Sequence, residues 1–185
     1  MMKTSIVIPV NGDLVIRSYQ DGDQEPLVKY INNRKIWLNL TDSVPHPYTR
    51  KDAEKWIAHA MSEHPPQNFA IANGTELIGG IGLKFKKDVK RHSAAVGYWL
   101  GEPFWGKGIM TQALRAFILW AFRTYPLKRI SAGVYESNPA SGRVLEKVGF
   151  ILEGRLRKAI LKNDQFLDMY LYSILREEVL SQRPE

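Results

Sequence analysis

Two glycines separated by a single lysine are the residues whose types and spacing most clearly suggest chemistry. Gly106, Lys107 and Gly108 follow a strand-like apolar stretch and precede a long apolar segment with a helical pattern. Glycines let the backbone approach a ligand closely, and the free N–H groups of a first helical turn attract anions. The spacing therefore predicts a cradle for a phosphate-like group, although a tight strand-to-helix turn explains two such glycines about as often.

Two common nucleotide-binding motifs are excluded at this position. A P-loop requires Gly-Lys-Ser or Gly-Lys-Thr at a fixed spacing, and this stretch has neither. A dinucleotide fingerprint requires a third glycine where Thr111 stands, and an acidic residue at a strand end about 20 positions further on. The predicted cradle therefore holds its phosphate in another way.

The elements that position the cradle follow from hydrophobic periodicity and from breaker residues. In chain order we expect a strand at 14–18, a helix with an acidic opening at Asp21, Asp23 and Glu25, an irregular segment at 32–47, a helix capped by Thr49 and Asp52 and ended by Pro65-Pro66, strands at 69–72, 77–85 and 93–100, a helix at 106–124, a strand at 129–134, a helix from Asn138 to Gly149, and a hairpin of 150–161 with 166–175. Strand–helix–strand units beside antiparallel hairpins predict an α/β fold with a mixed sheet and helices on both faces.

One block of sequence around the glycines resembles the acetyl-CoA motif of the GNAT acetyltransferase family. It consists of Tyr98-Trp99-Leu100, residues 105–111 and Ala113-Leu114. The predicted helix that begins at Asn138 carries a second block, at 138–141, 144–150 and 153–154, which is similar to that family's second motif.

The pattern resembles most closely the RimJ/RimL-like branch of this family, which includes enzymes that acetylate the N-termini of ribosomal proteins. Residues 45–57 are similar to the acceptor-side helix of that branch. The resemblance runs from about Leu14 to Leu175, nearly the whole chain. It implies the GNAT fold, a mostly antiparallel central sheet that splays between two central strands, as a single N-acetyltransferase domain over residues 14–177.

The resemblance also implies acetyl-CoA as cosubstrate, with no metal. The cofactor-binding residues that it implies are Tyr98, Trp99, Leu100, Gly106, Lys107, Gly108, Ile109, Met110, Thr111, Asn138 and Arg143. The pyrophosphate would lie on the amides of residues 106–110. The pantetheine arm would pair with residues 98–100, where the strands at 93–100 and 129–134 splay apart. Arg143 or Lys147 would meet the nucleotide phosphates, and the alternative is that each is only a solvated helix charge.

The sequence departs from the family pattern where many relatives carry functional groups. Pro103 stands where many have Gln or Arg, Leu145 where many have a general-acid tyrosine, and 94–96 where many have a glutamate. Some members have an acid within the stretch that here reads 156–160. With no obvious base, Ser141 is the best candidate to protonate the leaving thiolate, and the alternative is that it serves only the helix start.

The absence of a base favours an α-amine as acceptor. About a tenth of an α-amine with a pKa near 8 is neutral at pH 7, against about 0.04% of a lysine-like amine. We therefore expect acetyl transfer to a protein N-terminus, such as that of a ribosomal protein, within a ternary complex. The alternatives are a small-molecule amine such as an aminoglycoside or a polyamine and, from another class, a non-catalytic acyl-CoA-binding module.

Composition narrows the partners and the location. The formal net charge is +7, and it arises after Pro66, where 18 Lys/Arg face 11 Asp/Glu, against eight of each before. This excess suits an anionic partner, but no basic stretch is interleaved with aromatic residues, so we expect no direct nucleic-acid binding.

Metal and membrane functions find no support in the sequence. There is no cysteine, and the four histidines lack a ligand spacing, so we expect no metal site. The longest apolar run, 116–122, is too short to span a membrane. We expect a cytoplasmic protein that is a monomer or a homodimer.

Overall fold

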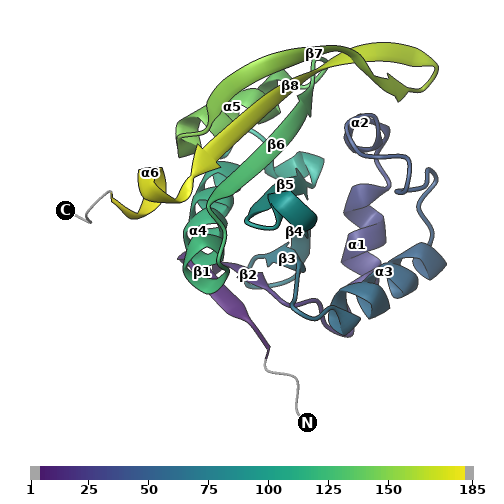
Figure 1. Cartoon of the computed structure of the whole chain (residues 1–185). Coiled ribbons are helices and arrows are strands. Elements are labelled where there is room, and N and C mark those ends of the chain that lie inside the picture. Colours follow the sequence, from purple (N-terminus) through teal and green to yellow (C-terminus); the bar gives the residue numbers. More distant parts are fainter. Residues whose placement is uncertain (1–4, 182–185) are drawn as a thin grey trace. The chain divides into compact units, whose positions relative to one another are not determined.

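The computed structural model describes residues 5–181 (Figure 1). Its strands are β1 (Val7–Asn11), β2 (Leu14–Arg17), β3 (Asn68–Ala72), β4 (Leu77–Phe85), β5 (Ser93–Leu100), β6 (Arg129–Tyr135), β7 (Ile151–Lys162) and β8 (Gln165–Leu175). Its helices are α1 (Gln24–Ile31), α2 (Arg34–Trp37), α3 (Arg50–Ser62), α4 (Ile109–Thr124), α5 (Pro139–Val148) and α6 (Arg176–Leu180). Two short 3-10 turns are η1 (Asp88–Lys90) and η2 (Glu102–Phe104).

Hydrogen bonding links the strands of the described chain in the order β1-β2-β3-β4-β5-β6-β8-β7. The pairs β1–β2, β2–β3, β3–β4, β6–β8 and β7–β8 are antiparallel, whereas β5 and β6 pair in parallel. The parallel pairing covers Ser93–Ala95 and Arg129–Ser131, so it ends within the first half of β5. The predicted α/β fold with a mixed, mostly antiparallel sheet is confirmed.

Contacts divide the chain into two compact units. Within the described residues, the first unit contains 5–82 and Tyr98–Ala116, and the second contains Leu83–Gly97 and 117–181. The glycine cradle belongs to the first unit, whereas α5 belongs to the second. The single domain over 14–177 stays a prediction.

The first unit has an apolar core to which α1 and α3 contribute. Leu27 of α1, Ile57 of α3 and Leu77 of β4 are buried in one cluster. Helix α3 begins as predicted because Thr49 and Asp52 form a capping box, in which each side chain accepts a hydrogen bond from the other residue's backbone N–H. Such a box satisfies two N–H groups that the first helical turn leaves unpaired.

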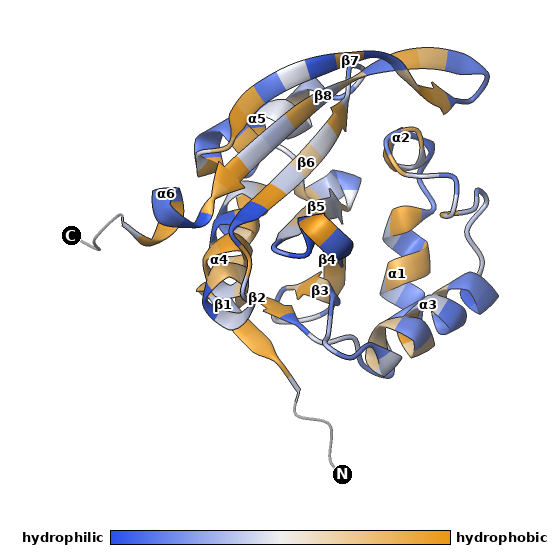
Figure 2. Cartoon of the chain, in the orientation of Figure 1, coloured by the Kyte–Doolittle hydropathy of each residue, from blue (hydrophilic) through white to orange (hydrophobic). Residues whose placement is uncertain are grey.

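The second unit is built on β6, β8 and β7, with α5 joining β6 to β7. Leu145 of α5 and Ile130 of β6 are fully buried. Helix α5 ends at Gly149, whose φ of 102° is the left-handed conformation of a helix C-cap. The hairpin turn of β7 and β8 uses Asn163 and Asp164, with φ of 49° and 59°, which these residue types tolerate. Figure 2 shows hydrophobic and hydrophilic residues alternating along this hairpin.

The structure differs from the sequence prediction at several helix starts. Helix α4 begins at Ile109 and not at Gly106, because Gly106 and Gly108 both have φ of 73°, which an α-helix cannot contain. Asp23 is the N-cap residue of α1 and Glu25 lies in its first turn, in agreement with the predicted acidic opening, but the Asp23 side chain makes no cap hydrogen bond. Its buried carboxylate instead accepts hydrogen bonds from the guanidinium of Arg17 at 2.7 and 2.8 Å. Strand β1 and the short helices α2 and α6 were not predicted.

The helices and the acidic and histidine side chains of residues 5–181 bear on membrane spanning and on metal binding. No helix in this range is long and apolar enough to cross a membrane. In the same range, no three side chains of His, Asp or Glu are grouped so that they would hold a metal ion.

Candidate functional site

The turn that leads from β5 into α4 is held by hydrogen bonds among its own residues. The indole Nε1 of Trp105 donates to the carbonyl oxygen of Leu100 at 2.7 Å, and the Phe104 N–H donates to the carbonyl of Gly101 at 3.0 Å. Pro103 lies at the start of η2, where a missing N–H is tolerated. These contacts fix the direction in which the backbone enters the two glycines.

Both glycines of the cradle are required by the backbone and leave open space above it. At φ of 73°, Gly106 and Gly108 adopt a conformation that L side chains rarely occupy. A Cβ added to Gly106 would meet no atom within 4 Å, and one added to Gly108 would meet only Nε2 of Gln112, at 3.9 Å. A ligand can therefore approach the backbone here as closely as the predicted cradle requires.

The start of α4 adds donors and a positive charge at the same place. The N–H of Gln112 makes the first intrahelical hydrogen bond, to Gly108, at 3.1 Å. The amides of residues 109–111 precede it, and such first-turn amides have no partner within their helix. Lys107 is exposed, with its Nζ 6.0 Å from the centre of the Phe104 ring. Together these groups can bind an anion through the backbone, the helix dipole and one ammonium.

The one acidic residue of η2, Glu102, is already engaged. Its carboxylate accepts hydrogen bonds from Lys35 Nζ and from Asn33 Nδ2, the latter at 2.6 Å. The Lys35 ammonium first, and Asn33 second, hold the pKa of the Glu102 carboxyl below its usual value. The negative charge closest in sequence to the cradle is thus balanced by α2.

Two of the three side chains in the predicted arm-binding segment turn toward packing. Trp99 contacts the apolar core of the first unit, and Leu100 is buried. Strand β4 has glycines, Gly79 and Gly80, at the two positions that lie against Trp99. A Cβ on Gly79 would lie 2.5 Å from the Trp99 carbonyl oxygen, and a Cβ on Gly80 would lie 2.6 Å from its indole Nε1. Backbone pairing of residues 98–100 with a ligand stays a prediction.

A small hollow of about 210 Å³ borders the first turn of α4 in the first unit. It is lined by Asn11, Asp13, Leu14, Asn73, Ile78, Phe104, Ile109 and Gln112. The lining contains a carboxylate and amides but no cation, so this hollow does not extend the phosphate cradle.

The aromatic residues beside the predicted acceptor-side helix offer no base. Tyr19 packs edge-on against Trp56, with ring centres 6.4 Å apart, and burial strongly raises the pKa of the Tyr19 phenol. Burial first, and the nearby Asp52 carboxylate second, raise the pKa of Tyr48 to about 12. Both phenols are protonated at neutral pH.

In the second unit, the predicted residues Asn138, Ser141 and Arg143 lie on the first turns of α5. The Asn138 side chain accepts a hydrogen bond from the Ser141 N–H at 3.2 Å, so it caps the helix as predicted. Ser141 is half-buried, and Arg143 is exposed. Their roles toward a cofactor stay predictions.

Two residues of the second motif, Leu145 and Glu153, have contacts that stabilise the fold. Leu145, at the position where many relatives carry an acidic tyrosine, is fully buried. Glu153 accepts hydrogen bonds from Arg129 and from the Ser173 hydroxyl, at 2.6 Å each. Arg129 first, and Ser173 second, lower the pKa of Glu153 to about 2. Glu153 therefore stabilises the sheet and is too weak a base to accept a proton at neutral pH.

Sequence reasoning missed the carboxylate of Asp168. Its oxygens accept hydrogen bonds from the backbone N–H of Lys158 and from Arg155, and its own N–H donates to Glu136 at 2.8 Å. The available signal was a single charged residue within the largely apolar and aromatic sequence of β8. These contacts join β7, β8 and the segment after β6.

Comparison with known proteins gives a consistent result. The family model described as acetyltransferase (GNAT) domain matches residues 13–151. A ribosomal-protein-serine acetyltransferase of Escherichia coli is 31% identical over 170 residues, which are 90% of this chain and 94% of that protein. A [ribosomal protein uS5]-alanine N-acetyltransferase of Escherichia coli is 35% identical over 172 residues, 87% of each chain.

A solved structure with bound ligands is also similar. The microcin C7 self-immunity acetyltransferase MccE, in complex with acetyl-CoA and AMP, has a TM-score of 0.77 and 26% sequence identity. The likeness covers 90% of this chain and 94% of that one.

Proposed function

Since this chain belongs to the acetyltransferase (GNAT) family and is an N-acetyltransferase, we propose that it transfers the acetyl group of acetyl-CoA to the α-amine of a protein N-terminus. The observation that carries the proposal is the open glycine cradle at the start of α4, inside the stretch that the family model matches. The acceptor is supported by the two relatives named for ribosomal-protein serine and alanine acetylation.

The residues of the cradle fit a pyrophosphate. The open space above Gly106 and Gly108 admits a phosphate, and the amides of 109–111 with Lys107 supply donors and charge. The backbone of 98–100 would hold the pantetheine arm, and Asn138 and Arg143 would contact the cofactor from α5. Acetyl-CoA bound in this way supplies an activated thioester.

The proposed acetyl transfer requires few catalytic side chains. The amine nitrogen attacks the thioester carbonyl carbon, the carbon–sulfur bond breaks, and the amine loses one proton while the thiolate gains one. Ser141 would donate the proton to sulfur. The α-amine needs no strong base, because about a tenth of it is neutral at pH 7. This matches the absence of a suitable base among Tyr19, Glu153 and Asp168, which are either held protonated or held as ion-paired carboxylates.

A small-molecule amine is the second candidate acceptor. The similarity to the microcin C7 self-immunity acetyltransferase favours it, since that name does not refer to a ribosomal protein.

A cytoplasmic location and a monomeric or homodimeric state also stay predictions.

The test measures release of the CoA thiol with three sets of acceptors: peptides with a free N-terminus, polyamines and aminoglycosides. We expect the highest kcat/KM with peptides that have a free N-terminus. The same peptides acetylated at the N-terminus should give no turnover. Turnover confined to small amines would establish the second candidate. A thermal shift with acetyl-CoA but no turnover would indicate a binding module, and no shift at millimolar acetyl-CoA would overturn the proposal.

A further inference from the structure

Strand β7 carries a bulge opposite Asp168. Leu156 pairs with Met169 and Ile160 pairs with Leu167, so residues 157–159 of β7 face the single residue Asp168 of β8. Extra residues in one strand bend it and redirect its side chains. Bulges are frequent beside functional sites for this reason.

The backbone of the bulge is strained at Lys158. In residues 5–181, four residues other than glycine have positive φ: Asp88, Lys158, Asn163 and Asp164. Three of them are Asp or Asn, the types that tolerate this conformation, and they lie in turns. Lys158, with φ of 51°, lies within a strand and has no such tolerance. A strained backbone persists only where surrounding contacts hold it, and such places cluster at ligand sites.

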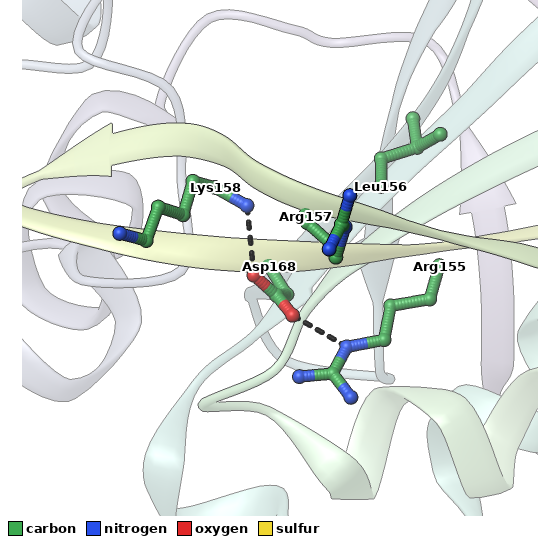
Figure 3. Close-up of a pocket in the computed structure, with 5 residues that line it drawn as sticks. All are labelled: Arg155, Leu156, Arg157, Lys158 and Asp168. Carbon is green, nitrogen blue, oxygen red and sulfur yellow. Dashed lines mark hydrogen bonds and ion pairs between the residues drawn. The ribbon is translucent and has the colours of Figure 1, made fainter.

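Asp168 is the contact that holds the bulge. It is only 7% exposed, and its Oδ1 accepts the Lys158 N–H at 2.7 Å while Oδ2 accepts Nε of Arg155. Figure 3 shows the carboxylate between these two donors, with Nζ of Lys158 directed away from it. The Lys158 N–H first, and Arg155 second, hold the pKa of Asp168 below its usual value, so the carboxylate is charged at neutral pH.

The bulge borders a hollow with an excess of positive charge. The hollow, of about 670 Å³, is lined by Arg155, Leu156, Arg157, Lys158 and Asp168. Arg155 balances Asp168. Among the described residues no salt bridge involves Arg157 or Lys158, and both are exposed. The charge of Arg157 also acts on Asp168. The three cations still exceed the single carboxylate by two charges, and they lie beside an apolar side chain, Leu156, that is 43% exposed.

We propose that this hollow binds the carboxylates of an acidic segment close to the N-terminus of the acceptor protein, and so selects acceptors; this rests on the proposed function. Arg157 and Lys158 would pair with the carboxylates, and Leu156 would contact an apolar side chain of the same segment. A peptide combines these features at short spacing. A nucleic acid is disfavoured, because its continuous row of phosphates calls for a longer basic track than Arg157 and Lys158 provide.

The hollow is joined to the segment that carries the candidate acid. The N–H of Asp168 donates to Glu136, and the N–H of Glu136 donates to the Asp168 carbonyl oxygen at 3.0 Å. Glu136 stands two positions before Asn138, the residue that caps α5 and accepts from the Ser141 N–H. A peptide held in the hollow is thus bound within the same unit, and on the same hydrogen-bonded framework, as Ser141.

The test uses pairs of peptides that differ only by charge. Each pair begins with the same residue and carries Asp or Glu, or the matching Asn or Gln, at positions two to six. Two double variants are compared with the native protein. One is Arg157→Glu with Lys158→Glu, and the other is Lys86→Glu with Lys87→Glu, a pair of exposed residues outside the hollow that changes the net charge equally.

We expect the native protein and the Lys86/Lys87 variant to prefer the acidic peptides through a lower KM. The Arg157/Lys158 variant should lose or invert this preference, with the kcat for amide peptides and the KM for acetyl-CoA unchanged. Single neutralisations, Arg157→Gln and Lys158→Gln, should each reduce the preference about two- to fivefold, the range of exposed ion pairs. A preference that survives the double reversal, or that is absent from the native protein, overturns the inference.

Binding of the product separates this inference from the proposed function. Acidic peptides acetylated at the N-terminus and labelled at the C-terminus should bind the native protein by fluorescence anisotropy, more weakly with rising salt and not to the Arg157/Lys158 variant. This result supports the hollow even if no acceptor is turned over. Equal binding of the labelled peptide by the native protein and the Arg157/Lys158 variant contradicts the inference. So does displacement of the labelled peptide by short RNA but not by unlabelled acidic peptide.

Discussion

Substitution of Gly108 by aspartate should weaken acetyl-CoA binding strongly, mainly through charge. The added carboxylate would stand in the open space above the cradle, where a Cβ meets only Gln112, at 3.9 Å. Two unit charges about 5 Å apart repel by about 1 kcal/mol in water and about 3 kcal/mol at an effective dielectric constant of 20. Acetyl-CoA affinity should therefore fall roughly 5- to 150-fold from charge alone.

Gly108→Asn is the matched control, because asparagine has the shape of aspartate without its charge. Both substitutions place a side chain at φ of 73°, which costs about 1 kcal/mol and is tolerated best by these two residue types. Both should therefore lower the melting temperature of the free protein by roughly 2–4 °C.

Isothermal titration calorimetry, at low and at high salt, measures the difference in acetyl-CoA affinity between the Gly108→Asp and Gly108→Asn variants. The affinity gap should narrow as salt screens the repulsion. Equal affinities of the Asp and Asn variants, or a gap independent of salt, would show that no phosphate lies on this turn.

The remaining predictions concern a proton donor and an ion pair. If Ser141 protonates the thiolate, Ser141→Ala should lower kcat by about 10²-fold with acetyl-CoA affinity unchanged, and the Asn138 cap survives because it bonds the backbone N–H of residue 141. Unchanged kcat with about 1 kcal/mol less stability would assign Ser141 to the helix start alone. Because Arg129 and Ser173 depress the pKa of Glu153 to about 2, its contribution to stability is present above a pH of about 4.3 and is lost as pH falls toward 2. Urea denaturation of Glu153→Gln should accordingly show lower stability at pH 7 and a shallower decline below pH 5, and an unchanged pH profile would refute this.

Local signals explain why most elements could be predicted. The Thr49 capping box, the Asn138 cap and the left-handed Gly149 each depend on contacts within a few residues, and the structure contains all three. The start of α4 was placed wrongly, because the helical pattern of apolar residues does not show that Gly106 and Gly108 have positive φ.

Pairing between side chains of different elements explains what could not be predicted. Asp23 looks like a helix-opening carboxylate in sequence, yet it pairs with Arg17 on β2, six positions away. Asp168 holds a bulge in a neighbouring strand, a relation set by sheet register that no single stretch of sequence shows. The turn of the predicted cradle could be located from sequence because its glycines and the helix start are contiguous. Its ligand, and the role of Ser141, stay predictions.

The glycines of β4 constrain the order in which this protein could change. A side chain at Gly80 would meet the Trp99 indole at 2.6 Å and the Tyr19 hydroxyl at 2.9 Å, both of them side-chain atoms that another substitution can remove. At Gly79 the obstacle is the carbonyl oxygen of Trp99, 2.5 Å away, which no substitution removes. Residue 80 can thus be enlarged by mutation only after both residue 99 and residue 19 have become smaller or have shifted, whereas no side-chain substitution opens space at residue 79.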